Sequence, residues 1–134
     1  MFRNPQVVLF SSDVERLGAF YRQLGFTETF RVPIEGIPIH IDVELDGYLI
    51  GIASVASTRD DHNLQPVENG QRAAVVFWTD DTVAAYEELI GRGCRALHPP
   101  HIWLDRLLIA WIADPDDHPV QIVQSIEPGT HNEA

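Results

Sequence analysis

The chain repeats one strand-and-helix pattern at a fixed spacing. Residues 6–13 read Gln-Val-Val-Leu-Phe-Ser-Ser-Asp, and residues 74–81 read Ala-Val-Val-Phe-Trp-Thr-Asp-Asp. Each apolar run leads into a helical pattern, which ends at Gly25 in the first copy and at Gly93 in the second, 68 residues later. A repeat at a constant spacing predicts that one supersecondary unit is used twice.

The size and composition of the chain fit one globular domain. Two halves of about 55–60 residues would each be marginal alone, so we expect the halves to share a core. No apolar run approaches the ~20 residues that span a bilayer, and the N-terminus has no secretory apolar region. The only cysteine, Cys94, forms no intrachain disulfide, which is typical of a reducing compartment. These features predict a cytoplasmic protein.

The net charge of −11 limits the partners that the chain can bind. It argues against a nucleic-acid backbone and against an anionic membrane. It favours a cationic small molecule, although many proteins are equally acidic for solubility alone.

The first repeat, about 5–56, has the pattern of a βαβββ unit. A strand at 7–10 precedes a helix that Ser12 is expected to cap, with Glu15 completing a capping box. Gly25 is expected to end the helix in the left-handed conformation. Three strands follow at 27–32, 37–45 and 48–56, separated by residues 33–36 and by the Asp46-Gly47 hairpin signal.

The second repeat, about 72–126, follows a linker at 57–71 that is rich in turn-forming residues. A strand at 73–78 and a helix at 81–92 come first. A short strand at 94–97, a loop rich in proline and histidine, a strand at 107–113, a turn at 114–118 and a strand at 120–126 complete the unit. Residues 127–134 are expected to form a frayed tail.

Strands joined by such short turns pair mostly antiparallel, and each helix covers one face of its sheet. We expect the other faces of the two sheets to curve around a shared concavity. Alternation along the first strand of each unit places Gln6, Phe10, Ala74 and Trp78 on that concave side.

Paired βαβββ units resemble the vicinal oxygen chelate superfamily, which contains glyoxalases, bleomycin-resistance proteins and extradiol dioxygenases. Residues 11–26, Ser-Ser-Asp-Val-Glu-Arg-Leu-Gly-Ala-Phe-Tyr-Arg-Gln-Leu-Gly-Phe, are similar to the first strand–helix segment of that family. Residues 114–124, Asp-Pro-Asp-Asp-His-Pro-Val-Gln-Ile-Val-Gln, are similar to its Asp-Pro-Asp-Gly-Asn turn and closing strand. The resemblance covers roughly residues 5–126. It implies an α+β fold of two tandem βαβββ units, with curved mixed sheets around a shared concave pocket and the helices outside.

The resemblance also implies where metal ligands would lie. Metal-dependent members carry ligands on the first and last strands of each unit, which map to Gln6, Gly51, Ala74 and Gln121. Ala74 and Gly51 have no side-chain donor, and two neutral amides do not hold Zn²⁺, Ni²⁺ or Fe²⁺ against water. We therefore expect no metal and no other cofactor.

Four histidines have more than one interpretation. His98 and His101 form an H-x-x-H pair that is more typical of a surface loop than of a metal site. His118 occupies a turn position and is expected to face solvent. His40 shares a face with Asp42 and Glu44, and that face is either solvent or pocket.

Other polar groups have structural interpretations. Asp13, Asp80 and Asp81 lie near the helix starts, where carboxylates favour capping. Cys94 aligns with Phe26 in the repeat and is expected to be a buried apolar residue.

The aromatic residues give the favoured function, which is metal-free binding of a small planar aromatic molecule, cationic or neutral, in the manner of bleomycin-resistance proteins. We expect Phe10, Trp78 and Trp111 to stack on the ligand, and Gln6 and Gln121 to orient it. A tryptophan on a strand is also commonly a core residue, and alternation does not tell which face Trp111 occupies.

Two alternatives remain open. One is a metal-dependent lyase or dioxygenase whose displaced ligands come from His40, His98 or His101. The other is a structural or regulatory dimer without a ligand. No catalytic residue is identified, and open sheet edges predict a homodimer.

Overall fold

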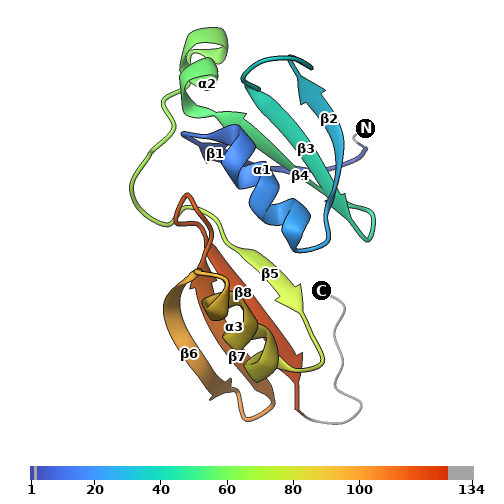
Figure 1. The fold of residues 1–134 in the computed structure, drawn as a ribbon, viewed down its shortest axis with the longest axis vertical. Helices are drawn as coiled ribbons and strands as arrows, with labels where there is room; N and C mark the ends of the chain where they lie inside the picture. Colours follow the sequence, from blue (N-terminus) through green and yellow to red (C-terminus); the bar gives the residue numbers. More distant parts are fainter. Residues whose placement is uncertain (2, 127–134) are drawn as a thin grey trace. The chain divides into compact units, whose positions relative to one another are not determined.

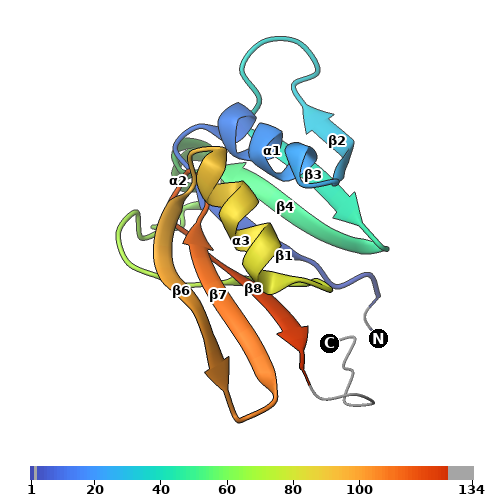
Figure 2. The same cartoon turned by 60° about the horizontal axis from the view of Figure 1, so that its bottom comes forward.

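The computed structural model describes residue 1 and residues 3–126, so the tail expected at 127–134 lies outside the described residues. The chain divides into two compact units, Met1–Gly70 and Gln71–Ala134. In each unit a four-stranded mixed sheet carries a helix against one face (Figure 1, Figure 2). The predicted α+β fold of two tandem βαβββ units is confirmed.

Unit 1 contains one helix more than the sequence predicted. Its elements are β1 (Val7–Ser11), α1 (Val14–Gln23), β2 (Thr27–Val32), β3 (His40–Leu45), β4 (Tyr48–Ser54) and α2 (Val55–His62). The strand order is β1-β4-β3-β2, with β1 parallel to β4 and the other neighbours antiparallel.

Unit 2 repeats this topology. Its elements are β5 (Val75–Trp78), α3 (Thr82–Gly91), β6 (Arg95–Trp103), β7 (Leu107–Ala113) and β8 (Pro119–Ser125). The strand order is β5-β8-β7-β6, again with one parallel pair, β5 and β8. Helices α1 and α3 start 68 residues apart, which is the spacing of the sequence repeat.

The core of unit 1 lies between α1 and the sheet. Leu17 and Tyr21 of α1 and Ile41 and Ile52 of the sheet are fully buried, and burial of each aliphatic side chain stabilises by about 1.5–3 kcal/mol. Gly18 lets the helix approach closely, because a Cβ there would lie 3.3 Å from Cδ1 of Ile41.

The core of unit 2 lies in the same place relative to α3. Ala110, Ile112, Val120 and Ile122 are fully or almost fully buried. The Thr82 hydroxyl at the start of α3 donates to the carbonyl of Leu108 on β7 at 2.9 Å. Ala110 pairs with Ile122 and Ile112 with Val120, so these four side chains share the sheet face that packs on α3.

Both helices begin at an aspartate. The Asp13 carboxylate accepts from the backbone N–H of Arg16 at 3.1 Å, and that of Asp81 accepts from Ala84 at 3.0 Å. The capping expected of both aspartates is confirmed. The prediction that Ser12 caps the first helix is wrong by one residue, because the N-cap is Asp13. The predicted capping box is also wrong, because Glu15 binds the side chains of Arg22 and Arg31.

Glycines close the turns as the sequence predicted. Gly25 and Gly93 follow the two helices with φ of 109° and 100°, a region that favours residues without a Cβ. Asp46 and Gly47 form the tight turn between β3 and β4, with φ of 52° and 83°.

The segment predicted as the 57–71 linker begins with part of helix α2, and the strand predicted to reach residue 56 ends at Ser54. The sequence shows no apolar period here. This short helix is stabilised instead by hydrogen bonds at its first turn. The Ser54 hydroxyl accepts from the N–H of Ser57, and the Thr58 hydroxyl donates to the Ser54 carbonyl at 2.8 Å. Asn63, with φ of 56°, ends the helix.

The predicted loop of prolines and histidines is also wrong, because residues 98–101 belong to the nine-residue strand β6. Strand β6 lies at an edge of its sheet, where proline removes no necessary hydrogen bond. The pairing register with β7 shifts on both sides of His98, as at a β-bulge, and this hides the alternation in the sequence.

No helix within residues 3–126 is long and apolar enough to cross a membrane.

Candidate functional site

In unit 2 a row of side chains crosses the sheet on the face opposite α3. Val76 on β5 pairs with Gln121 on β8, Gln121 pairs with Trp111 on β7, and Trp111 pairs with His98 on β6. Directly paired residues point to the same side of a sheet. The register therefore assigns Trp111 to the face that the sequence left undetermined.

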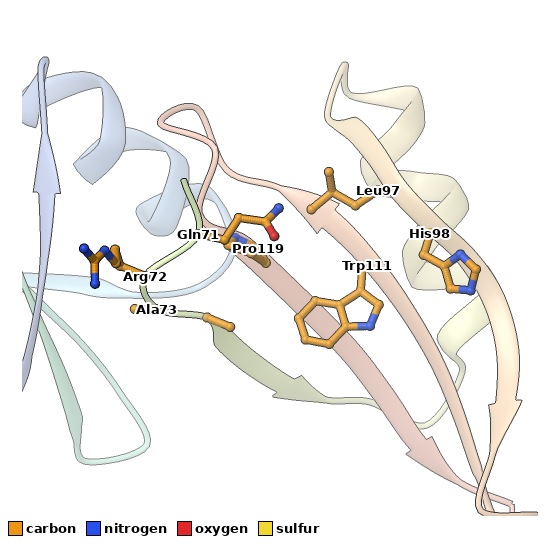
Figure 3. A pocket seen from close by; sticks show the side chains of 8 residues that line it. Gln71, Arg72, Ala73, Leu97, His98, Trp111 and Pro119 are labelled. Atoms are coloured by element: carbon orange, nitrogen blue, oxygen red, sulfur yellow. The ribbon is translucent and has the colours of Figure 1, made fainter. Parts of the chain in front are cut away.

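A cavity of about 590 Å³ opens at this face (Figure 3). It is lined by Gln71, Arg72, Ala73, Ala74, Leu97, His98, Trp111 and Pro119. The indole of Trp111 and the imidazole of His98 come from neighbouring strands, while Gln71 and Ala73 come from the segment that leads into β5. The Arg72 side chain points away from Trp111.

The cavity contains only some of the residues that the sequence selected. Trp111 lines it, whereas Trp78 and Gln121 lie on the same sheet face outside the lining. Gln71, Leu97 and Pro119 were missed. Their contribution depends on the path of the chain before β5 and on strand register, which sequence pattern does not give.

His98 and His101 form a close pair on the same face. In a regular strand, residues three apart point to opposite faces, but the register shift across Pro99 and Pro100 places both histidines on one face. Their ring centroids are 4.0 Å apart, at an interplanar angle of 62°. Nδ1 of His101 lies 2.9 Å from the carbonyl oxygen of Pro99.

In unit 1 the corresponding face carries a polar cluster built around Asp42. Oδ1 of Asp42 accepts from Nε2 of Gln6 at 2.8 Å and lies 2.7 Å from Nε2 of His40. Gly51 lies between Gln6 and Asp42, and a Cβ there would be 2.7 Å from the Gln6 nitrogen. The glycine therefore leaves the space in which Gln6 reaches Asp42.

A second cavity, of about 290 Å³, lies beside this cluster. It is lined by Phe30, Val32, Ile39, His40, Ala53, Ser57, Thr58, Asp61 and His62. Of the two settings that the sequence allowed for His40, solvent or pocket, the structure shows a pocket. Phe10 pairs with Ala53 on the same face of the sheet but is not part of the lining.

On the α1 side of the unit 1 sheet, away from these cavities, a cluster of charged groups has a structural role. Arg31 makes a two-pronged ion pair with Glu28 and also binds Glu15. The hydrogen bond from Arg31 is the main reason that the pKa of each glutamate lies below its ordinary value, and these bonds raise the pKa of Arg31.

Two residues differ from their sequence interpretation. Nδ1 of His118 lies 2.7 Å from the fully buried carboxylate of Asp114, and its side chain is only 16% exposed, so it does not face solvent. Cys94 is half-buried rather than fully buried, and burial raises the pKa of its thiol.

Two sheets of the same order, each with a parallel outer pair and a ligand-sized cavity on the face opposite its helix, define a class of tandem βαβββ proteins. Comparison with known families shows to which superfamily of this class the chain belongs. The model of the Glyoxalase/Bleomycin resistance protein/Dioxygenase superfamily matches residues 3–122, so the chain belongs to this superfamily. No curated protein matches the sequence.

Solved structures share the fold at low sequence identity. A glyoxalase/bleomycin resistance protein/dioxygenase from Nocardioides is 19% identical, with a TM-score of 0.78 over 100% of this chain and 90% of that one. TioX from Micromonospora sp. ML1 is 17% identical, with a TM-score of 0.73 over 93% and 100%. Lactoylglutathione lyase from Agrobacterium tumefaciens is 21% identical, with a TM-score of 0.67 over 89% and 90%.

The metal that this superfamily implies does not fit the residues at the expected positions. Gly51 pairs with Val8 on the neighbouring strand, and Gln121 pairs with Val76 in the same way, which supports treating 51 and 121 as equivalent. Neither valine nor Gly51 offers a donor, and the space at Gly51 holds the bond from Gln6 to Asp42. Ala74 has no donor either, and Gln6 and Gln121 supply only neutral amides, which are weak ligands for a divalent transition metal.

Proposed function

We propose that this protein binds a small planar aromatic molecule without a metal ion, in the cavity of unit 2. The observation that carries the proposal is the position of Trp111 in a cavity of about 590 Å³, a volume typical of small-molecule sites. The proposal assigns no catalytic residue.

The lining indicates what the ligand offers. Trp111 provides a flat surface for stacking, and Ala73 and Ala74 occupy little of the space near it. Gln71 and His98 supply polar groups that orient the ligand. The acidic composition of the chain favours a cation, but among the described lining residues there is no carboxylate to pair with one. We therefore propose an uncharged ligand.

The test separates stacking from a role of Trp111 in the core. Two probes with the same ring, 2-naphthamide and 2-naphthylmethylammonium, are titrated into the protein while heat and melting temperature are followed. The uncharged amide is expected to bind more tightly. Trp111→Ala is expected to remove about 1–3 kcal/mol of binding free energy, as truncation of buried aromatic anchors does.

Trp103→Ala is the matched control, because Trp103 is 54% exposed and does not line the cavity. It is expected to leave naphthamide binding unchanged. If Trp111→Ala binds the amide as the wild type does, or loses stability instead of affinity, the cavity is not the site. The ligand-binding roles of Phe10, Trp78, Gln6 and Gln121 remain predictions.

A second candidate function follows from the histidine pair. Two imidazoles with centroids 4.0 Å apart would supply two ligands of a displaced metal site, which would support a lyase or dioxygenase function. Within the described residues, however, no group of three or more His, Cys, Asp or Glu side chains is arranged to hold a metal. About one equivalent of metal in dialysed protein, lost in His98→Ala, would favour this candidate over metal-free binding.

A further inference from the structure

The cavity of unit 1 has an apolar wall and a polar wall. Phe30, Val32, Ile39 and Ala53 form the first, and Ser57, Asp61 and His62 of α2 contribute to the second. Its volume of about 290 Å³ lies at the lower end of small-molecule sites. A single aromatic ring with a short substituent fits such a space.

His40 also lines this cavity, and two contacts hold its ring in one orientation. Its Nε2 lies 2.7 Å from Oδ1 of Asp42, and the Phe30 ring packs edge-on against the imidazole at a centroid distance of 6.0 Å. Gln6 donates to the same carboxylate oxygen and thereby fixes Asp42.

The bond to Asp42 selects the tautomer of His40. A carboxylate only accepts hydrogen bonds, so Nε2 must carry the hydrogen, and Nδ1 of the neutral imidazole is left with a lone pair. Within residues 3–126 no side chain or backbone group hydrogen-bonds Nδ1. His40 lines the cavity, and its free acceptor, Nδ1, is the ring nitrogen left to interact with a ligand.

We propose that this cavity is a binding site for a small phenol. The phenol hydroxyl donates to Nδ1 of His40, its ring lies against Phe30 and Val32, and Asp42 acts as a positioning residue that keeps His40 in the accepting tautomer. Asp61 on α2 favours a ligand with a positive rather than a negative charge on its substituent. The site belongs to unit 1 and does not depend on the function proposed for unit 2.

Tyramine and phenethylamine test the proposal, because they differ only in the phenolic hydroxyl. Calorimetry on the full chain is expected to show tyramine binding at least about tenfold more tightly, since without the hydroxyl the oriented acceptor stays unpaired. His40→Gln keeps an amide donor near the Nε2 position and removes the acceptor, so tyramine should bind it no better than phenethylamine does. His40→Asn keeps an oxygen near the Nδ1 position and should retain part of the preference.

Glu44→Gln is the matched control, because Glu44 lies on the same strand and face but outside the lining. It should leave the preference for tyramine unchanged. Nitrogen-15 NMR of the histidine rings in the wild-type protein adds a measurement that needs no variant. Before ligand is added, Nδ1 of His40 should have the chemical shift of a ring nitrogen without hydrogen, and tyramine should move it.

Three results would overturn the proposal. These are no tyramine binding at millimolar concentration, equal binding of the two amines by the wild type, and a preference that persists in His40→Gln. The last result, together with an unmoved His40 resonance, would assign tyramine to a different cavity.

Discussion

Gly51→Ala should disturb this protein in a way that depends on Gln6. A Cβ at position 51 would lie 2.7 Å from Nε2 of Gln6, closer than two such atoms approach. The Gln6 side chain must therefore move, and its 2.8 Å bond to Asp42 is lost. Because the bond is exposed, we assign it about 0.5–1.5 kcal/mol, below the usual value for a bond to a charged group.

A second effect acts in the opposite direction. Glycine in a strand costs about 0.5–1 kcal/mol relative to alanine because of its greater freedom in the unfolded chain. The φ of Gly51 is not positive, so alanine can adopt the same backbone conformation. From these two effects, Gly51→Ala alone should change the unfolding free energy by an amount between a gain of about 0.5 and a loss of about 1 kcal/mol.

The double-mutant cycle with Gln6→Ala isolates the contact. Without the Gln6 side chain, Gly51→Ala keeps the gain of about 0.5–1 kcal/mol from the unfolded chain, less the cost of its contacts to Val8 and Asp42, and no longer loses the bond. Its remaining close contacts, 3.1 Å to Val8 and 3.2 Å to Asp42, are the same in both backgrounds. The coupling energy should then be about 0.5–1.5 kcal/mol.

Urea unfolding followed by circular dichroism measures these free energies. All three tryptophans lie in unit 2, so their fluorescence reports on that unit, and coincident transitions show whether the chain unfolds in two states. An equal effect of Gly51→Ala with and without the Gln6 side chain would refute the reasoning.

Three further predictions concern acid stability, cysteine reactivity and assembly. The folded-state pKa of Glu15 and Glu28 lies below 4.5, mainly through the hydrogen bond from Arg31, so their stabilisation is present above pH 4.5 and is lost as the pH falls through the lowered values. Glu28→Gln should flatten this part of the acid unfolding curve, and a curve parallel to that of the wild type would contradict the assignment. Cys94 should react with an aromatic disulfide reagent more slowly in the folded than in the unfolded protein, because burial raises the pKa of its thiol; equal rates at pH 8 would contradict this. The 15.1 kDa chain should sediment as a homodimer at micromolar concentration, because each sheet has open edge strands, and a single 15.1 kDa species would end that claim.

The sequence predicts most of the fold because its strongest signals are local. Asp13 and Asp81 cap helices through contacts only three residues away, and Gly25 and Gly93 end them through their own backbone angles. Such signals do not depend on what lies across the sheet. The errors occur where local pattern is weak, as in the polar helix α2, or interrupted, as at the shifted register of β6.

The candidate sites are less predictable because they depend on register between distant segments. Alternation shows that His40 and Asp42 share a face, but the bond between Gln6 and Asp42 joins residues 36 apart in sequence. The face of Trp111 follows from its pairing with Gln121, which depends on the position of the turn before β8. The resemblance to the superfamily identifies positions 51 and 121 as equivalent. It does not show that the Gln6–Asp42 bond lies beside the first and Trp111 beside the second.

Positions 51 and 121 show how one repeated unit has acquired two different surfaces. Both lie beside a valine on the parallel neighbouring strand, so the backbone offers the same location twice. With glycine at 51, Gln6 reaches Asp42, and Asp42 in turn orients His40. With glutamine at 121, the neighbour across the sheet is Trp111, whose ring lines the larger cavity. The same backbone thus carries an oriented hydrogen-bond acceptor in unit 1 and a stacking surface in unit 2. If the two cavities bind as proposed, removing the acceptor at His40 and removing the ring at Trp111 should impair different ligands, and each variant should leave the other ligand bound.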